Sequence, residues 1–227
     1  LGNSLNFATD CEITLEANPA TVEHDNFEGY LAAGINRLSL GVQSFNPQHL
    51  QILGRIHSQQ DAFNAIRLAK TAGFNNFNLD LMHGLPQQDL NQALDDIDCA
   101  LSFNPNHLSW YQLTIEPNTA FYRQPPTLPE DDILWAIQEA GQAKLAQAGL
   151  QQYEVSAYSQ QQPSKHNLNY WQFGDYLGIG AGAHGKVTTP EGIFRYRKTR
   201  LPKDYLAAAP QQQARLGLEQ IDRKSVG

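Results

Sequence analysis

The chain has 227 residues, of which 41% are hydrophobic, and this length and composition suit one large α/β domain or two smaller ones. Its formal net charge is −7 at pH 7 and it carries no basic stripe, which argues against a nucleic-acid partner. It has no run of 18 apolar residues and no secretory leader, so we expect a cytoplasmic protein without an integral membrane segment.

Strands and helices are predicted in alternation along the chain. The expected strands cover residues 11–18, 37–44, 77–84, 107–115, 153–159 and 176–182, and the expected helices cover 22–33, 59–72, 90–102 and 129–148. Three helix ends share one pattern, in which Gly34, Gly73 or Gly149 supplies the positive φ of a helix end and a strand follows within three residues. Helices that feed strands in this way predict an α/β fold with a parallel sheet, most of an open β/α barrel.

The expected strands alternate between an apolar and a polar face. The apolar faces, predicted to pack against helices, consist of Leu38, Leu40, Val42, Phe77, Leu79, Leu81, Tyr153, Val155 and Ala157. The opposite faces are polar or small, with Thr14, Glu16, Asn18, Ser39, Gly41, Gln43, Asn78, Asp80, Met82, Glu154, Ser156 and Tyr158. A closed barrel fills its interior with branched apolar residues. The polar interior therefore predicts a wider, incomplete barrel that holds a polar ligand.

Polar side chains are expected at the carboxyl ends of the strands, where β/α barrels place their working residues. These candidates are Glu16, Asn18, Gln43, Asp80, His83, Thr114 and Glu116. Arg55, just before a predicted helix, is either a surface arginine or a fork that binds a carboxylate. Each residue alone is most often a cap or turn residue, but their convergence on one rim indicates a ligand site.

The stretch KHNLNYWQFGDYLGIGAGAHGKV, from Lys165 to Val187, gathers His166, two asparagines and two aromatic residues ahead of a glycine-alanine run that ends in His184. From the residues alone, His166 is more often a hydrogen-bonded loop residue and Trp171 a core residue than ligand contacts. The cysteines Cys11 and Cys99 lie far apart, and reduced, buried thiols are expected rather than a disulfide or a metal pair.

Seven motifs in order resemble the radical S-adenosylmethionine (SAM) proteins related to oxygen-independent coproporphyrinogen III oxidase. They are EITLEANP, GINRLSLGVQSF, LGRIH, FNLDLMHGLPQQ, LSWYQLTIEPNT, HNLNYW and GDYLGIGAGAHG, and they run from Glu12 to about Tyr205. HNLNYW favours the haem-chaperone branch, the HemW type, over the oxidase. The resemblance implies a partial β/α barrel, a [4Fe–4S] cluster on a three-cysteine loop, and SAM bound across the rim.

The resemblance also assigns roles to particular residues. It implies SAM contacts for the matching positions Glu16, Gln43, Arg55, Asp80, Thr114 and, at the end of the glycine run, Ala183 or His184. It makes His166 a candidate ligand of haem iron, since neutral imidazole is a common axial ligand. Tyr170 and Trp171 could then stack on or flank the porphyrin, and Asn167 and Asn169 could orient the histidine or accept hydrogen bonds from the haem side.

The chain departs from the family at both ends. It starts at Leu1 without the family's C-x-x-x-C-x-x-C loop, so we expect a piece of a longer protein whose cluster ligands lie upstream. The expected domains are a barrel core over 1–200, the start of a cut-short C-terminal domain over 201–220 and a non-native tail over 221–227.

Two functions remain open from the sequence. The first is a haem-binding chaperone that delivers haem to acceptor proteins, respiratory enzymes among them. The second is SAM-dependent oxidative decarboxylation of coproporphyrinogen III to protoporphyrinogen IX. HNLNYW, expected of the chaperone, discriminates between them, and a third possibility is an inert piece of a gene.

Overall fold

The computed structural model describes residues 7–21, 26–208 and 219–221. The chain divides into two compact units, Leu1–Pro163 and Ser164–Gly227, which are described separately. The first unit contains β1 (Thr14–Ala17), η1 (Pro19–Thr21), α1 (Asn26–Ala32), β2 (Arg37–Gln43), α2 (Pro47–Ile52), α3 (Gln59–Ala72), β3 (Phe77–His83), α4 (Leu90–Leu101), β4 (His107–Gln112), α5 (Ala120–Arg123), α6 (Asp131–Gln147), β5 (Gln151–Gln152) and β6 (Ala157–Ser159). The second contains α7 (Lys165–Trp171), β7 (His184–Thr189), β8 (Gly192–Arg197), α8 (Pro202–Ala207) and β9 (Glu219–Ile221).

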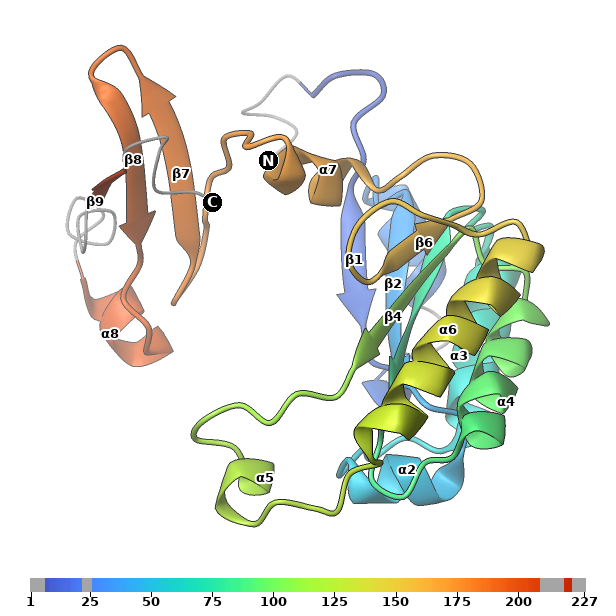
Figure 1. The fold of residues 1–227 in the computed structure, drawn as a ribbon. Helices are drawn as coiled ribbons and strands as arrows, with labels where there is room; N and C mark the ends of the chain where they lie inside the picture. Colours follow the sequence, from blue (N-terminus) through green and yellow to red (C-terminus); the bar gives the residue numbers. More distant parts are fainter. Residues whose placement is uncertain (1–6, 22–25, 209–218, 222–227) are drawn as a thin grey trace. The chain divides into compact units, whose positions relative to one another are not determined.

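The first unit is built on one six-stranded sheet with the order β1-β2-β3-β4-β6-β5. Strands β1 to β4 pair in parallel, each with the next along the chain. Helices α3, α4 and α6 lie on one side of these strands (Figure 1). This confirms the predicted α/β class with an open sheet built from β/α units, and the described strands do not close into a barrel.

The helix signals of the sequence correspond to observed caps. The Ser58 side chain and Asp61 form a capping box at the start of α3. Gly73 ends the same helix in the left-handed region with φ 104°, and Gly34 and Gly149 also have positive φ. These three glycines thus end helices as predicted, which sets the direction in which each following strand enters the sheet.

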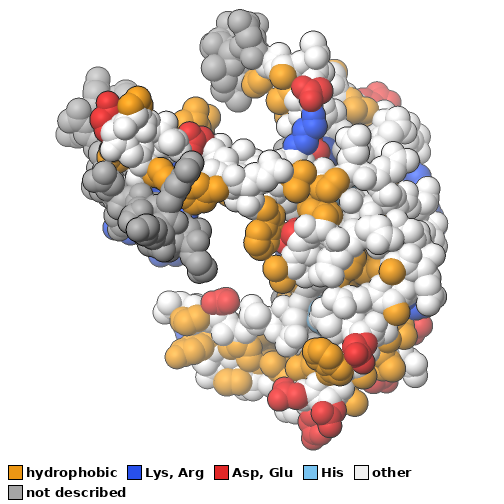
Figure 2. Space-filling model, turned by 45° about the horizontal axis from the view of Figure 1, so that its top comes forward, with side chains coloured by type: hydrophobic (Ala, Val, Ile, Leu, Met, Phe, Trp, Pro, Cys, Tyr) orange, Lys and Arg blue, Asp and Glu red, His pale blue; other side chains and the backbone are white. Residues whose placement is uncertain are grey.

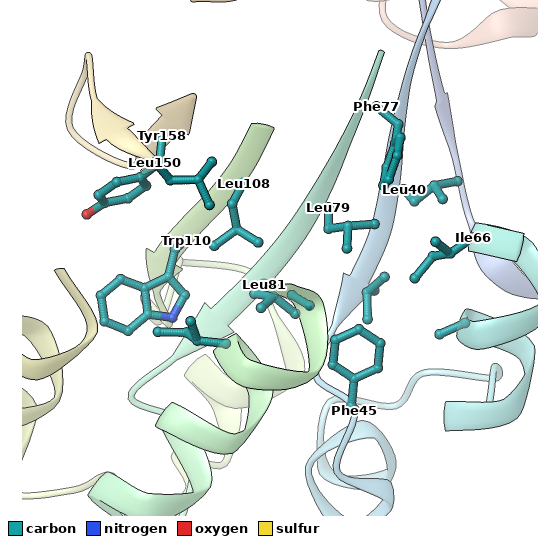
Figure 3. Packing of buried hydrophobic residues seen from close by; sticks show 14 of the residues in the cluster. Leu40, Phe45, Ile66, Phe77, Leu79, Leu81, Leu108, Trp110, Leu150 and Tyr158 are labelled. Carbon is teal, nitrogen blue, oxygen red and sulfur yellow. The ribbon is translucent and has the colours of Figure 1, made fainter. Parts of the chain in front are cut away.

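The core lies between the sheet and these helices. Leu38, Leu40 and Val42 of β2 and Leu79 and Leu81 of β3 are fully buried, as their alternation predicts. Figure 3 shows leucines of β2, β3 and β4 pointing toward the helix side, with Phe45, Ile66 and Trp110 around them. Burial of one face leaves the alternate residues of the same strands on the opposite face of the sheet.

The prediction for residues 153–159 was wrong in the direction of the strand and in which side chains face the core. Instead of one parallel strand, β5 and β6 form an antiparallel pair, and β6 also pairs antiparallel with β4. Val155, expected in the core, is 72% exposed, whereas Tyr158, expected on the polar face, is 2% exposed and packs in the core. The reason is a reversal of the chain between the two short strands, since a reversal resets which residues face the helices.

Residues 176–182 were also expected to form a strand, and they do not. Tyr176 makes an isolated bridge to Lys186, and Gly180 and Gly182 have φ of 99° and 74°. Such backbone cannot continue a strand ladder. The second unit instead forms a three-stranded antiparallel sheet with the order β7-β8-β9.

The expected domain limits at residues 200 and 220 stay predictions. The expected core of 1–200 covers the whole first unit and part of the second, and the expected tail lies outside the described residues except Ile221. Among the helices of the described residues, none has the length and apolar character needed to cross a membrane.

Candidate functional site: a polar pocket on the sheet and an exposed aromatic helix

A polar pocket of about 360 Å³ lies on the first unit, on the polar face of β1 to β4. Its lining comes from the strand ends and from the loop before α3, and consists of Glu16, Ala17, Asn18, Ser39, Gly41, Gln43, Arg55, Asp80 and Tyr111. The structure thus brings together five residues that the sequence analysis predicted at the rim. The pocket combines two carboxylates, one guanidinium, amides and a phenol, which suits a polar ligand carrying both charges.

Asp80 stands at the centre of a hydrogen-bond network on the pocket side of β3. Its carboxylate accepts from the Ser39 hydroxyl at 3.1 Å and from Asn78 Nδ2 at 2.7 Å. Burial raises the pKa of Asp80, hydrogen bonds from Ser109, Ser39 and Asn78 lower it, and the Glu16 carboxylate raises it. The network holds the Asp80 side chain in one orientation toward the pocket.

Gln43 occupies a special backbone position at the end of β2. Its φ is 69°, and the β2–β3 register shifts between Leu40 and Gln43. Its side-chain oxygen accepts a 2.7 Å hydrogen bond from the Tyr111 hydroxyl. A left-handed non-glycine residue costs free energy that neighbouring contacts must offset, and such positions gather at ligand sites.

Tyr111 is a pocket residue that the sequence analysis did not name. Burial and the nearby Asp80 carboxylate raise the pKa of its phenol. Alternation along 107–115 places Ser109 and Tyr111 on one face, and this signal could have identified Tyr111. Thr114, named instead, lies past β4 outside the pocket lining, and its hydroxyl donates to Glu116 Oε1 at 3.4 Å.

His83 is a rim residue that the prediction placed on the wrong face. It is 1% exposed, and its ring lies 4.1 Å from the Trp110 ring, which belongs to the core. Its position in β3 shares the parity of Phe77, Leu79 and Leu81, so the period of the strand directs it to the helices. Burial lowers its pKa to about 4.

The histidine–asparagine–aromatic motif forms a short helix, α7, at the start of the second unit. The Ser164 hydroxyl caps it by accepting from the Asn167 backbone N–H. Tyr170 and Trp171, on its last turn, are 46% and 61% exposed, so Trp171 is not the core residue that the sequence alone favoured. The His166 and Tyr170 rings meet edge to face at 4.9 Å between centroids.

Asp175 and Lys186, which lie on either side of the glycine run after α7, pair with each other. Lys186, which is 2% exposed, donates to Asp175 at 2.8 Å and lies 4.1 Å from the centre of the Phe173 ring. The Asp175 carboxylate also accepts from the Thr188 N–H and hydroxyl. The hydrogen bond from Lys186, followed by the two from Thr188, lowers the pKa of Asp175 to about 2. A tilted contact between the Tyr170 and Tyr176 rings, with 4.8 Å between their centroids, joins α7 to this segment.

Ala183 and His184, the remaining expected SAM contacts, belong to the second unit. His184 begins β7, is exposed and lines a second pocket within that unit. Residues 183 and 184 are therefore not part of the pocket lining on the first unit.

The cysteines do not supply a cluster site. Cys11 and Cys99 are both unpaired and partly buried, and burial raises the pKa of the Cys99 thiol to about 11. Across residues 7–21, 26–208 and 219–221, no three His, Cys, Asp or Glu side chains are grouped so as to hold a metal ion. The residues present here do not fit a [4Fe–4S] cluster, which needs thiolate ligands.

Comparisons with known proteins show which proteins this chain is similar to. Residues 4–100 match the model of the Radical SAM superfamily. The chain is 59% identical over 204 residues to the haem chaperone HemW of Haemophilus influenzae, covering 89% of this chain and 53% of that protein. It is 58% identical over 204 residues to HemW of Escherichia coli, covering 89% of this chain and 54% of that protein. The chain thus spans about half the length of the curated relatives it matches.

The fold is similar to a solved radical SAM enzyme. Coproporphyrinogen III oxidase (HemN) from Escherichia coli superposes with a TM-score of 0.82 at 22% identity, covering 98% of this chain and 54% of that chain. At that identity the likeness shows the fold. The predicted resemblance to radical SAM proteins, and to the haem-chaperone branch among them, is confirmed by these matches.

Proposed function

We propose that this chain, similar to the haem chaperones and carrying a radical SAM fold, is part of a protein that binds haem and passes it to acceptor proteins. The observation that carries the proposal is the set of exposed side chains on α7, where the His166 and Tyr170 rings meet edge to face and Trp171 is 61% exposed. An imidazole can ligate haem iron, and flat aromatic rings can lie against a porphyrin. The 58–59% identity to haem chaperones supports the same reading.

The polar pocket of the first unit is the proposed SAM site. The Arg55 guanidinium suits the carboxylate of SAM, and the Glu16 and Asp80 carboxylates suit its amino and hydroxyl groups. Gln43, held by Tyr111, would orient the ligand within the pocket. SAM together with an iron–sulfur cluster supplies radical chemistry when bound. Cys11 and Cys99, the two cysteines of this chain, do not fit such a cluster.

Further SAM contacts, the haem acceptors and the location of the protein are also proposals. Contacts of Thr114, Ala183 and His184 with SAM, respiratory enzymes as haem acceptors and a cytoplasmic location are all expectations of the family resemblance. The coproporphyrinogen oxidase alternative is supported by the shared fold with HemN, which does not distinguish the two functions.

The test is haem titration of the full-length protein, followed by absorbance. We expect stoichiometric binding by the wild type and loss of the axial-ligand spectrum in His166→Ala. Gln172→Ala is the matched control, because Gln172 is exposed at the C-cap of the same helix, and it should bind as the wild type does. An unchanged spectrum in His166→Ala would mean that another residue ligates the haem iron. Absence of haem binding by the wild type would reject the chaperone function.

A further inference from the structure

A second pocket, of about 550 Å³, lies within the second unit where β7 begins and β8 ends. Its described lining is Gly182, His184, Arg197, Lys198, Thr199 and Arg200, which we call the basic pocket. The β-ladder pairs His184 with Arg197. Beyond it, the Lys198 N–H donates to the Ala183 carbonyl at 2.7 Å, and the Gly182 N–H donates to the Thr199 carbonyl at 2.8 Å. These backbone hydrogen bonds hold the two walls of the pocket in place.

The charge of the basic pocket contrasts with that of the chain. The whole sequence has a net charge of −7, yet three of the six lining residues are cationic and none is acidic. Asp and Glu side chains are spread over the face of the molecule in Figure 2, on which Lys and Arg are sparse. Clustering Arg197, Lys198 and Arg200 costs free energy through like-charge repulsion, and a bound anion would offset that cost.

The basic residues are not neutralised by the rest of the described chain. Lys144–Asp98 and Lys186–Asp175 pair elsewhere, and among the described residues no ion pair is seen for Arg197, Lys198 or Arg200. Lys198 Nζ lies 5.9 Å from the centre of the Tyr196 ring, a weak contact that leaves its charge available. Arg197, Lys198 and Arg200 thus line one pocket, and no ion pair with another described residue neutralises them.

The chemistry of the lining defines the ligand class. Guanidinium groups bind planar carboxylates through paired N–H donors. A volume of about 550 Å³ exceeds that of one small anion, which indicates an anionic group on a larger molecule. Haem carries two carboxylate side chains on one edge, and α7, with His166, belongs to the same unit. We infer that the basic pocket binds the carboxylate groups of the haem; this inference rests on the proposed function.

The experiment compares haem with its dimethyl ester, in which both carboxylates are blocked, on the full-length protein. The Arg197→Gln/Arg200→Gln double variant should bind haem about 10-fold more weakly, to the level of the ester, and should bind the ester as the wild type does. It should keep the axial-ligand spectrum that His166→Ala loses. Arg195→Gln is the matched control, because Arg195 is exposed on the same strand and does not line the pocket.

The outcomes separate this inference from the proposed function. If the double variant keeps the wild-type ratio of haem to ester affinity, the basic pocket does not bind the haem carboxylates. If neither the wild type nor the variants bind haem, the proposed function fails. The pocket is then tested with metal-free protoporphyrin IX and its dimethyl ester. An equal ratio of the two affinities in the wild type and the double variant would overturn the inference. If inorganic phosphate raises the Tm of the wild type alone while the haem to ester ratio is unchanged, the site is for free phosphate and the inference is overturned.

Discussion

At the residue scale, the polar pocket depends on side chains that hold one another. Asp80 is oriented by Ser39 and Asn78, and Gln43 is oriented by Tyr111. Glu16 and Arg55 are exposed in the pocket wall and carry charge without contributing to the core. Their substitution therefore tests ligand binding separately from folding.

Glu16→Gln and Arg55→Gln should each weaken SAM binding about 10-fold, because each removes a charge-assisted hydrogen bond to the ligand. The measurement is calorimetric titration of the reconstituted full-length protein with SAM. Glu139→Gln is the control, since Glu139 is exposed on α6 and outside the pocket. Wild-type affinity for SAM in both pocket variants would show that SAM does not bind in this pocket.

At the element scale, the approach of α6 to the sheet depends on one glycine. Gly141 lies within α6, and a Cβ placed there would stand 2.0 Å from Cη2 of Trp110 on β4. Trp110 is buried against His83, so its ring has little room to move. The absence of a side chain at Gly141 lets the helix and the strand meet at this distance.

Gly141→Ala should lower the free energy of unfolding by about 1–3 kcal/mol, although alanine favours the helix, because overpacking against the indole outweighs propensity. Urea unfolding followed by circular dichroism measures it. Gly29→Ala, in α1, is the matched control, because nothing lies within 4 Å of its added Cβ, and it should stabilise by about 0.5–1 kcal/mol. Equal effects of the two substitutions would contradict the packing explanation.

At the scale of the whole molecule, the first unit buries histidines. His49, His57, His83 and His107 are at most 5% exposed, and in the described structure the Nδ1 atom of each lacks a hydrogen-bond partner. Burial lowers the pKa of all four, to about 4 for His83 and His107. Asp96 acts in the opposite sense, since burial raises its pKa to about 6.

The free energy of unfolding should therefore fall as the pH drops from about 6.5 to 4, because the unfolded chain then binds protons that the buried imidazoles cannot take up. His83 alone contributes on the order of 3 kcal/mol across that window. Asp96 reduces the slope between pH 4 and 6, where the folded state binds the additional proton.

Urea titrations at several pH values, compared with His83→Gln, measure the contribution of His83. The variant should show a shallower fall in unfolding free energy below pH 6.5 than the wild type. Identical slopes in the two proteins would show that the imidazole of His83 titrates normally in the folded state.

Much of the first unit could be predicted because its causes are local. A period of two along 37–43 and 77–83 separates Leu38 and Leu79 from Ser39 and Asp80, and parallel strands bring their carboxyl ends to one edge. Glu16, Asn18, Gln43, Arg55 and Asp80 therefore met in one pocket as expected. The glycines that follow the helices likewise predicted where each helix ends and the next strand begins.

Tertiary structure decided the rest. The reversal that makes β6 antiparallel turned Tyr158 into the core, and no local pattern in 153–159 encodes a pairing with β4. The end of β4 decided that Tyr111, and not Thr114, lines the polar pocket. The basic pocket arises because a β-ladder places His184 opposite Arg197, residues 13 apart in the sequence. Sequence periodicity reports which face a residue takes within its element, whereas pairing between elements depends on contacts that only the folded chain makes.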